Sequence, residues 1–165
     1  MATWSRARQT YGQATPTAGA PFDQSASLRA LQGDVGRAEP GAHWQGGAAA
    51  AYSAVNAEHA QVLGKLAVLD ARLAAEIDRS ARVVTAGRAE LDTVHDWVVS
   101  AAAAVPPTQA GELMKMPIVS KGVARLSEVM LKSNAELNAI GADIEQIGAE
   151  YRALSVQKFG SAPAP

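Results

Sequence analysis

The chain has 165 residues, enough for one domain with a buried core, and it contains no cysteine, which excludes disulfides and thiolate metal sites. Its net charge of -1 excludes the basic footprint that binding to nucleic acid or an anionic membrane would require. Charged residues make up only 19% and aromatic residues 5%, and alanine, which favours helix, takes their place. The composition therefore predicts an all-α protein.

The two ends of the chain are predicted to lie outside the helical domain. Residues 1–21 begin with MATWSRARQTYGQ, which lacks the apolar core of a secretory signal peptide. Glycines and prolines at four positions predict a short helical turn and then a flexible arm over this segment: Gly12, Pro16, Gly19 and Pro21. Residues 159–165 are predicted to form a Pro/Ala-rich tail. We assign residues 22–158 to one helical bundle domain.

The first predicted helix of this domain covers residues 22–38. Leu28, Leu31 and Val35 fall on one face at helical spacing. The sequence Glu39-Pro40-Gly41 ends the helix, because the residue before a proline avoids the helical region.

A long helix is predicted over residues 45–104. Its apolar residues step by three and four, and the phase slips between Leu73 and Ile77 before the series resumes at Val84. Gly64 and Gly87 weaken a helix without breaking it. The series before the slip is Tyr52, Val55, His59, Val62, Leu66, Leu69 and Leu73.

A second long helix is predicted over residues 119–158, after a connector at 106–118 that contains Pro106-Pro107 and a second breaker, Pro117. Its heptad seam has one polar member, Ser133, and it needs a partner helix along its length. The simplest partner is the preceding long helix, folded back into an elongated antiparallel hairpin that the residue 22–38 helix covers in part. The seam is Val119, Val123, Leu126, Met130, Ser133, Leu137, Ile140, Ile144, Ile147, Tyr151 and Leu154.

No enzymatic chemistry emerges from these patterns. The chain has no Gly-rich phosphate loop, nucleophile elbow or zinc-binding histidine motif, so we expect no catalytic, cofactor-binding or metal site. His59 lies on the apolar seam and is predicted to be packed, while His95 with Asp92 and Asp96 is better explained as a solvated helix face than as a metal site. Ser133 is predicted to set the register of the helices, because no base accompanies it at readable spacing.

Trp44 is the residue with two competing interpretations. It either fills the core or forms, with Gln45 and Gly46, a turn that presents a recognition surface. Gly46 permits a tight turn, and Tyr52 lies two helical turns beyond Trp44 on nearly the same side. We therefore predict an interaction site made of Trp44, Gly46 and Tyr52.

The pattern Pro40-Gly41-x-x-Trp44-x-Gly46-x-Ala48-Ala49-x-x-Tyr52 resembles the EspA/EspE family of mycobacterial type VII secretion-associated proteins, which are helical and carry a Trp-x-Gly turn. Three later segments are similar to the same family: LAVLDARLAAEID at 66–78, MPIVSKG at 116–122 and LKSNAELNAIG at 131–141. The resemblance spans residues 22 to about 150 in the family's order.

The resemblance implies a non-enzymatic protein that is cytoplasmic before export and then secreted, or associated with the cell envelope, through type VII secretion. Two departures qualify this expectation. Arg125, Glu128 and Lys132 lie where the family is strongly apolar, so we do not expect membrane association. The export signal of the class, a tyrosine with an acid four residues later, is absent: Tyr52, for example, is followed at that distance by Asn56. The resemblance therefore implies a co-secreted helical partner, a secretion chaperone or the secretion ATPase as binding partner.

Two other functions stay open at this point. The chain is either the N-terminal export module of a larger secreted effector or a cytoplasmic coiled-coil scaffold. We also predict that the seam of the second long helix associates with a partner or with a second copy, because small and polar residues near Ser80 and Gly87 offer poor sockets for its side chains. The predicted contact residues are Leu137, Ile140, Ile144 and Ile147.

Overall fold

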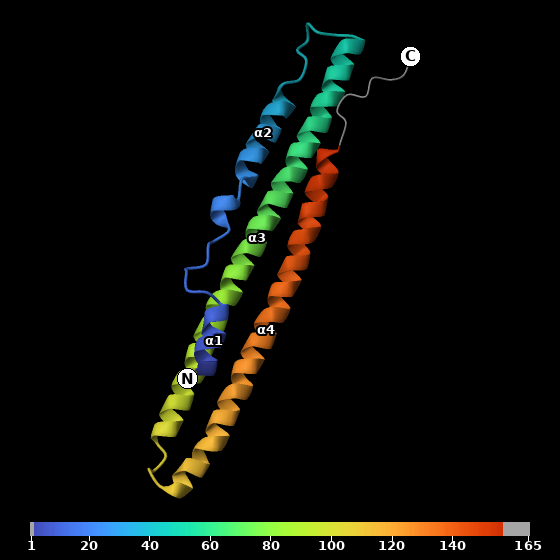
Figure 1. Cartoon of the computed structure of the whole chain (residues 1–165). Coiled ribbons are helices and arrows are strands. Elements are labelled where there is room, and N and C mark those ends of the chain that lie inside the picture. The colour runs from blue at the N-terminus through green and yellow to red at the C-terminus, as the bar shows by residue number, and fades with distance from the viewer. Residues whose placement is uncertain (1, 157–165) are drawn as a thin grey trace. The chain divides into compact units, whose positions relative to one another are not determined.

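The computed structural model describes residues 2–156, and every regular element in this range is helical (Figure 1). The elements are α1 (Ala2–Thr10), the 3-10 helix η1 (Ala20–Phe22), α2 (Ser25–Arg37), α3 (Gly47–Ala103) and α4 (Gln109–Ser155). The predicted all-α fold class is confirmed. The predicted tail at 159–165 lies outside the described residues.

The contacts divide the chain into two compact units. Within the described residues, unit 1 contains 2–17 and 79–141, and unit 2 contains 18–78 and 142–156. Helices α3 and α4 each contribute one part to either unit. The predicted boundaries at residues 21 and 158 stay predictions.

Unit 1 has a small aliphatic core between α1, α3 and α4. Leu91 of α3 is completely buried, which stabilises the folded state by about 1.5–3 kcal/mol relative to an exposed leucine. The two long helices run antiparallel in this unit. Lys132 donates a hydrogen bond to Glu90 and Gly122 lies against Val98, so the contacts advance along α3 while they move back along α4. The buried members of the core are Ala7, Leu91, Val94, Leu126 and Val129.

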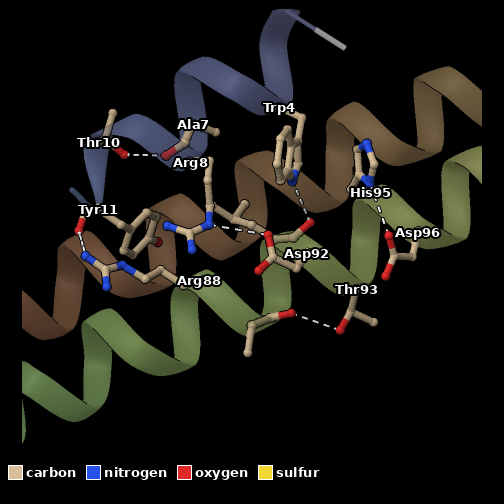
Figure 2. A network of polar contacts seen from close by, with 12 residues as sticks. Trp4, Ala7, Arg8, Thr10, Tyr11, Arg88, Asp92, Thr93, His95 and Asp96 are labelled. Carbon is tan, nitrogen blue, oxygen red and sulfur yellow. Dashed lines mark hydrogen bonds and ion pairs between the residues drawn. The ribbon is translucent and has the colours of Figure 1, made fainter. Parts of the chain in front are cut away.

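Helix α1 is attached to this core by polar contacts as well as by packing (Figure 2). The Trp4 indole Nε1 donates to the Leu91 carbonyl at 3.0 Å, and Arg8 pairs with Asp92 at 3.3 Å. Arg88 donates to the Tyr11 carbonyl at 2.6 Å. The sequence predicts only a short helical turn here, but the structure shows a nine-residue helix that contacts α3 and α4.

Unit 2 has its own pattern of contacts. Ala67 and Leu69 of α3 and Ile147 of α4 are buried, and Arg72 pairs with Glu150 at 2.7 Å. Tyr151 donates its hydroxyl to Asp70 at 2.8 Å, so α3 and α4 are joined by two polar links in this unit.

The segment before α2 is bound to α3 by two carboxylates. Asp78 accepts the backbone N–H of Gly19 at 2.7 Å, and Asp70 accepts that of Gln24 at 2.6 Å. A Cβ atom on Gly19 would lie 1.9 Å from the carbonyl oxygen of Ala74, so only glycine permits this close approach. Gly19 therefore lies directly against the backbone of α3.

The first two predicted helices of the domain are close to the observed ones. The structure shortens the residue 22–38 helix to 25–37, and just before it the Asp23 carboxylate accepts the Ser25 N–H at 2.9 Å. The long helix predicted at 45–104 spans 47–103.

The predicted start of the second long helix is wrong: α4 begins at Gln109, within the expected connector. Thr108 caps the helix, because its hydroxyl accepts the Gly111 N–H at 3.1 Å. Pro117 lies inside the helix and removes a hydrogen bond to the Leu113 carbonyl. Leu113, the residue whose carbonyl loses this partner, is itself strongly exposed. At the other end α4 stops at Ser155; residues 157–158 of the predicted helix lie outside the described residues.

The seam of α4 is also rotated from its predicted position in unit 1. Val119 and Val123 are exposed, whereas Gly122 and Val129, outside the predicted seam, are buried. A Cβ atom on Gly122 would lie 2.4 Å from Val98 Cγ2, so glycine lets the helices approach here. Four predicted seam residues are buried as expected: Leu126, Ser133, Ile140 and Ile147.

Candidate functional site

The Trp44 segment forms a turn that leads directly into α3. The Trp44 N–H donates to the Gly41 carbonyl at 2.9 Å, and Gln45 Nε2 donates to the Ala42 carbonyl at 3.0 Å. Gly46 has φ of +94°, a conformation that side-chain-bearing residues rarely adopt. Glycine at this position is therefore a backbone requirement of the turn.

The turn brings two of the predicted site residues into contact. The ring centroids of Trp44 and Tyr52 are 4.9 Å apart, with the planes tilted by 47°. Trp44 is 46% exposed and Tyr52 is 38% exposed, so the tryptophan does not fill the core. Both aromatic residues of the pair are thus partly exposed, and tryptophan and tyrosine are enriched in protein interfaces.

Two polar contacts that sequence reasoning missed fasten the turn to α3. The Asn56 amide donates to the Ala38 carbonyl at 2.9 Å, and the Ser53 hydroxyl donates to Glu39 at 2.6 Å. Asn56 is buried, and it satisfies a carbonyl at the end of α2. Asn56 lies one helical turn after Tyr52, but no sequence pattern indicates that its side chain bonds the Ala38 carbonyl.

The four predicted contact residues of the α4 seam differ in accessibility. Ile140 and Ile147 are buried within the chain, while Leu137 and Ile144 are half-buried. The premise that this part of the seam lacks sockets is therefore wrong for Ile140, which is only 3% exposed despite the small residues of α3. The interaction role of the four residues stays a prediction.

The histidines and the serine considered in the sequence analysis lie in helix-packing or surface positions. His95 packs against the Trp4 ring with centroids 4.5 Å apart and contacts Asp96 at 3.1 Å, whereas Asp92 pairs with Arg8 (Figure 2). His59 is half-buried, and Ser133 is buried in α4. Within residues 2–156, no group of three or more histidine, aspartate or glutamate residues is placed to hold a metal ion.

The polar links of unit 2 shift the acidity of their members. Burial raises the pKa of Tyr151 to about 12, and its hydrogen bond to the Asp70 carboxylate acts in the same direction. The hydrogen bond from Arg72 lowers the pKa of Glu150. Both links join α3 to α4, and no residue of the Trp44 turn takes part in them.

These features define a class: an all-α protein of packed helices that presents an exposed aromatic pair on a glycine-dependent turn. A profile of the EspA/EspE family matches residues 11–93, half of the chain, and the chain belongs to this family. The family is secretion-associated and non-enzymatic, so this is a type VII secretion-related protein.

The matched range contains the Trp44 turn. The two similar segments at 116–122 and 131–141 lie beyond it and stay untested. Neither curated proteins nor solved structures give a significant match to the chain. Along residues 2–156, no helix has the length and apolar character needed to cross a membrane.

Proposed function

We propose that the chain is a secreted substrate or accessory factor of a mycobacterial type VII secretion system and that the Trp44 turn is its recognition element. The observation that carries this proposal is the exposed Trp44–Tyr52 pair on a turn that Gly46 alone permits. A large aromatic residue held half exposed by its own turn gains little from folding. Its surface is available to a co-secreted helical protein, a chaperone or the secretion ATPase.

The other parts of the site support the same proposal. Asn56 and Ser53 hold the turn through contacts with residues 38 and 39, so the aromatic pair is fixed before a partner arrives. A preorganised contact loses less conformational entropy on binding than a flexible one.

The experiment compares export of single variants of the full chain in a cell with an active type VII system. Trp44→Ala removes the larger ring, and Phe22→Ala is the matched control, because Phe22 lies in the same unit and is 49% exposed. We expect Trp44→Ala to accumulate as folded protein in the cell and to be lost from the culture filtrate. Phe22→Ala is exported normally.

A second pair of variants separates the turn from the ring. Gly46→Ala forces a side chain into the positive-φ conformation, while Gly47→Ala places a Cβ where no atom lies within 4 Å. We expect only Gly46→Ala to impair export. Normal export of a folded Trp44→Ala protein would remove the recognition role, and absence of the wild-type chain from the filtrate would favour a cytoplasmic scaffold.

A further inference from the structure

Residues 18–38 of unit 2, which contain η1 and α2, form what we name the strap (Figure 1). The strap is joined to α3 at its start by two carboxylates. Asp78 accepts the backbone N–H of Gly19 at 2.7 Å. Asp70 accepts that of Gln24 at 2.6 Å. Hydrogen bonds to ionised acceptors are about twice as strong as those between neutral groups, so these two side chains hold the start of the strap on its neighbour.

Between its ends the strap buries little apolar surface. Ser25 is the only buried residue of α2, and Phe22 and Leu31 are each about half exposed. One inward position is filled by the amide of Gln32, which lies against Gly64 of α3. Few buried apolar contacts are typical of segments that open locally before the rest of a protein unfolds. The hydrogen bonds at the two ends therefore carry much of the attachment of the strap.

The end of the strap leads directly into the Trp44 turn. The buried Asn56 amide donates to the Ala38 carbonyl at 2.9 Å, and Ala38 is the last residue of the strap. The next residue, Glu39, accepts the Ser53 hydroxyl at 2.6 Å. The first anchor of the turn on α3 is therefore a backbone atom of the strap itself.

Helix α2 depends on α3 for its own structure. It has thirteen residues, and isolated helices shorter than about 12–15 residues are marginal in water. Gly33 and Gly36 weaken it further. A strap that separates from α3 therefore also loses its helix. The Arg72–Glu150 ion pair, in contrast, joins α3 to α4 without any residue of the strap.

We propose that the strap opens from α3 as one unit while α3 and α4 stay packed, and that this opening releases the Trp44 turn. Asp70 and Asp78 are then positioning residues for the turn, because they hold closed a segment whose other end anchors it. In the open form Asn56 loses the Ala38 carbonyl, and the turn loses the support that fixes it before a partner arrives. The role of the strap in recognition rests on the proposed function; its opening does not.

Digestion of the folded chain with trypsin measures the open population, because a helical site is cut only after it unfolds locally. Arg29 of α2 reports opening of the strap, and Arg72 of α3 is the internal control in the same unit. The full chain is digested without denaturant, and the initial rate of each first cut is followed by mass spectrometry. We expect cleavage after Arg29 to be at least about tenfold faster than cleavage after Arg72.

A graded pair of variants tests the role of the carboxylate. Asp78→Asn keeps a neutral acceptor for the Gly19 N–H, whereas Asp78→Ala removes the acceptor. We expect cleavage after Arg29 to rise about threefold in Asp78→Asn and about tenfold or more in Asp78→Ala, with no change after Arg72. Glu145→Gln is the matched control, because it removes an exposed acid of α4 in the same unit, and it should change neither rate. Circular dichroism confirms that each variant is folded.

Hydrogen exchange connects the opening of the strap to the Trp44 turn. The Trp44 N–H, which donates to the Gly41 carbonyl at 2.9 Å, reports the state of the turn. We expect its exchange to accelerate in Asp78→Ala by about the same factor as cleavage after Arg29, because one opening exposes both. The coupling must be reciprocal, so Asn56→Ala, at the other end of the strap, should also accelerate cleavage after Arg29.

Three results would each overturn the proposal. Equal cleavage after Arg29 and Arg72 in the unmodified chain would mean that unit 2 opens as a whole. Unchanged cleavage after Arg29 in Asp78→Ala would mean that the carboxylate does not hold the strap, and unchanged exchange of the Trp44 N–H in that variant would separate the strap from the turn. Neither measurement involves export, so failure of the strap is distinguished from failure of the proposed function, which export of Trp44→Ala decides.

Discussion

The two short helices that pack on α3, one in each unit, differ in how much they contribute to their unit. Helix α1 has nine residues, yet Ala7 joins the core of unit 1 and Trp4 and Tyr11 pack against it. Helix α2 has thirteen residues, but its only buried residue is Ser25. Helix length and apolar spacing therefore say less about attachment than the side chains that reach a neighbour's core or backbone.

The largest expected effect tests the attachment of α1. Trp4→Ala removes a ring packed on the core and the hydrogen bond to Leu91, so we expect a loss of about 2–3 kcal/mol in unfolding free energy. Urea denaturation measures this loss. Hydrogen exchange should accelerate in α1 and remain unchanged in α2; equal acceleration in both helices would contradict the comparison.

The next prediction concerns the segment that precedes α2. Gly19→Ala places a Cβ atom 1.9 Å from the Ala74 carbonyl oxygen, and the segment must move away from α3 at a cost of about 1–2 kcal/mol. Gly36→Ala is the control, because nothing lies within 4 Å of its Cβ and alanine favours helix. Thermal unfolding should show a lower midpoint for Gly19→Ala and an equal or higher one for Gly36→Ala. A midpoint unchanged in Gly19→Ala would show that the close approach is unimportant.

A pH dependence is expected in unit 2. The folded-state pKa of Tyr151 is raised from 10.0 to about 12, so folding favours the protonated phenol, and the resulting stability decreases as the pH rises from 10 through 12. At neutral pH, Tyr151→Phe should cost about 1 kcal/mol for the lost hydrogen bond to Asp70. Unfolding measured between pH 7 and 12 should show the two proteins converging at the alkaline end. A constant difference would mean that Tyr151 does not titrate in this range.

The smallest effect is expected in α2 itself. Leu31 is half exposed, so Leu31→Ala should change the unfolding free energy by no more than about 0.5 kcal/mol. Urea denaturation with Leu91→Ala as the contrasting variant provides the scale, since that fully buried leucine should cost about 2–5 kcal/mol. A large loss in Leu31→Ala would mean that α2 is attached more firmly than its exposure indicates.

The sequence predicts the helices better than their attachments. The bounds of α3 were close because sixty residues of apolar spacing between Gln45 and Ala104 contain no proline. The start of α4 was missed because two prolines suggested a loop, whereas the Thr108 cap is a weak signal in a single sequence. The packing of α1 depends on Leu91 and Asp92, more than eighty residues away, which no local pattern reveals.

The candidate site was predicted in part for the same reason. Trp44, Gly46 and Tyr52 lie within nine residues of each other, so local spacing identifies them as a group. Their exposure and the support from Asn56 depend on the path of residues 38–46, which the sequence does not specify. Similarly, the rotation of the α4 seam follows from the close contact of Gly122 with Val98.

The hydrogen bond from Asn56 to the Ala38 carbonyl also constrains how this lineage can change. An acid at position 56, four residues after Tyr52, would create the tyrosine–acid pattern of type VII export signals. Aspartate there would direct a carboxylate oxygen at a carbonyl oxygen that now accepts a bond at 2.9 Å, and the buried side chain at position 56 would lose its hydrogen bond. A single mutation that introduced the signal would thus damage the turn that displays Trp44. Selection acting on the turn would therefore disfavour acquisition of the tyrosine–acid pattern at this tyrosine.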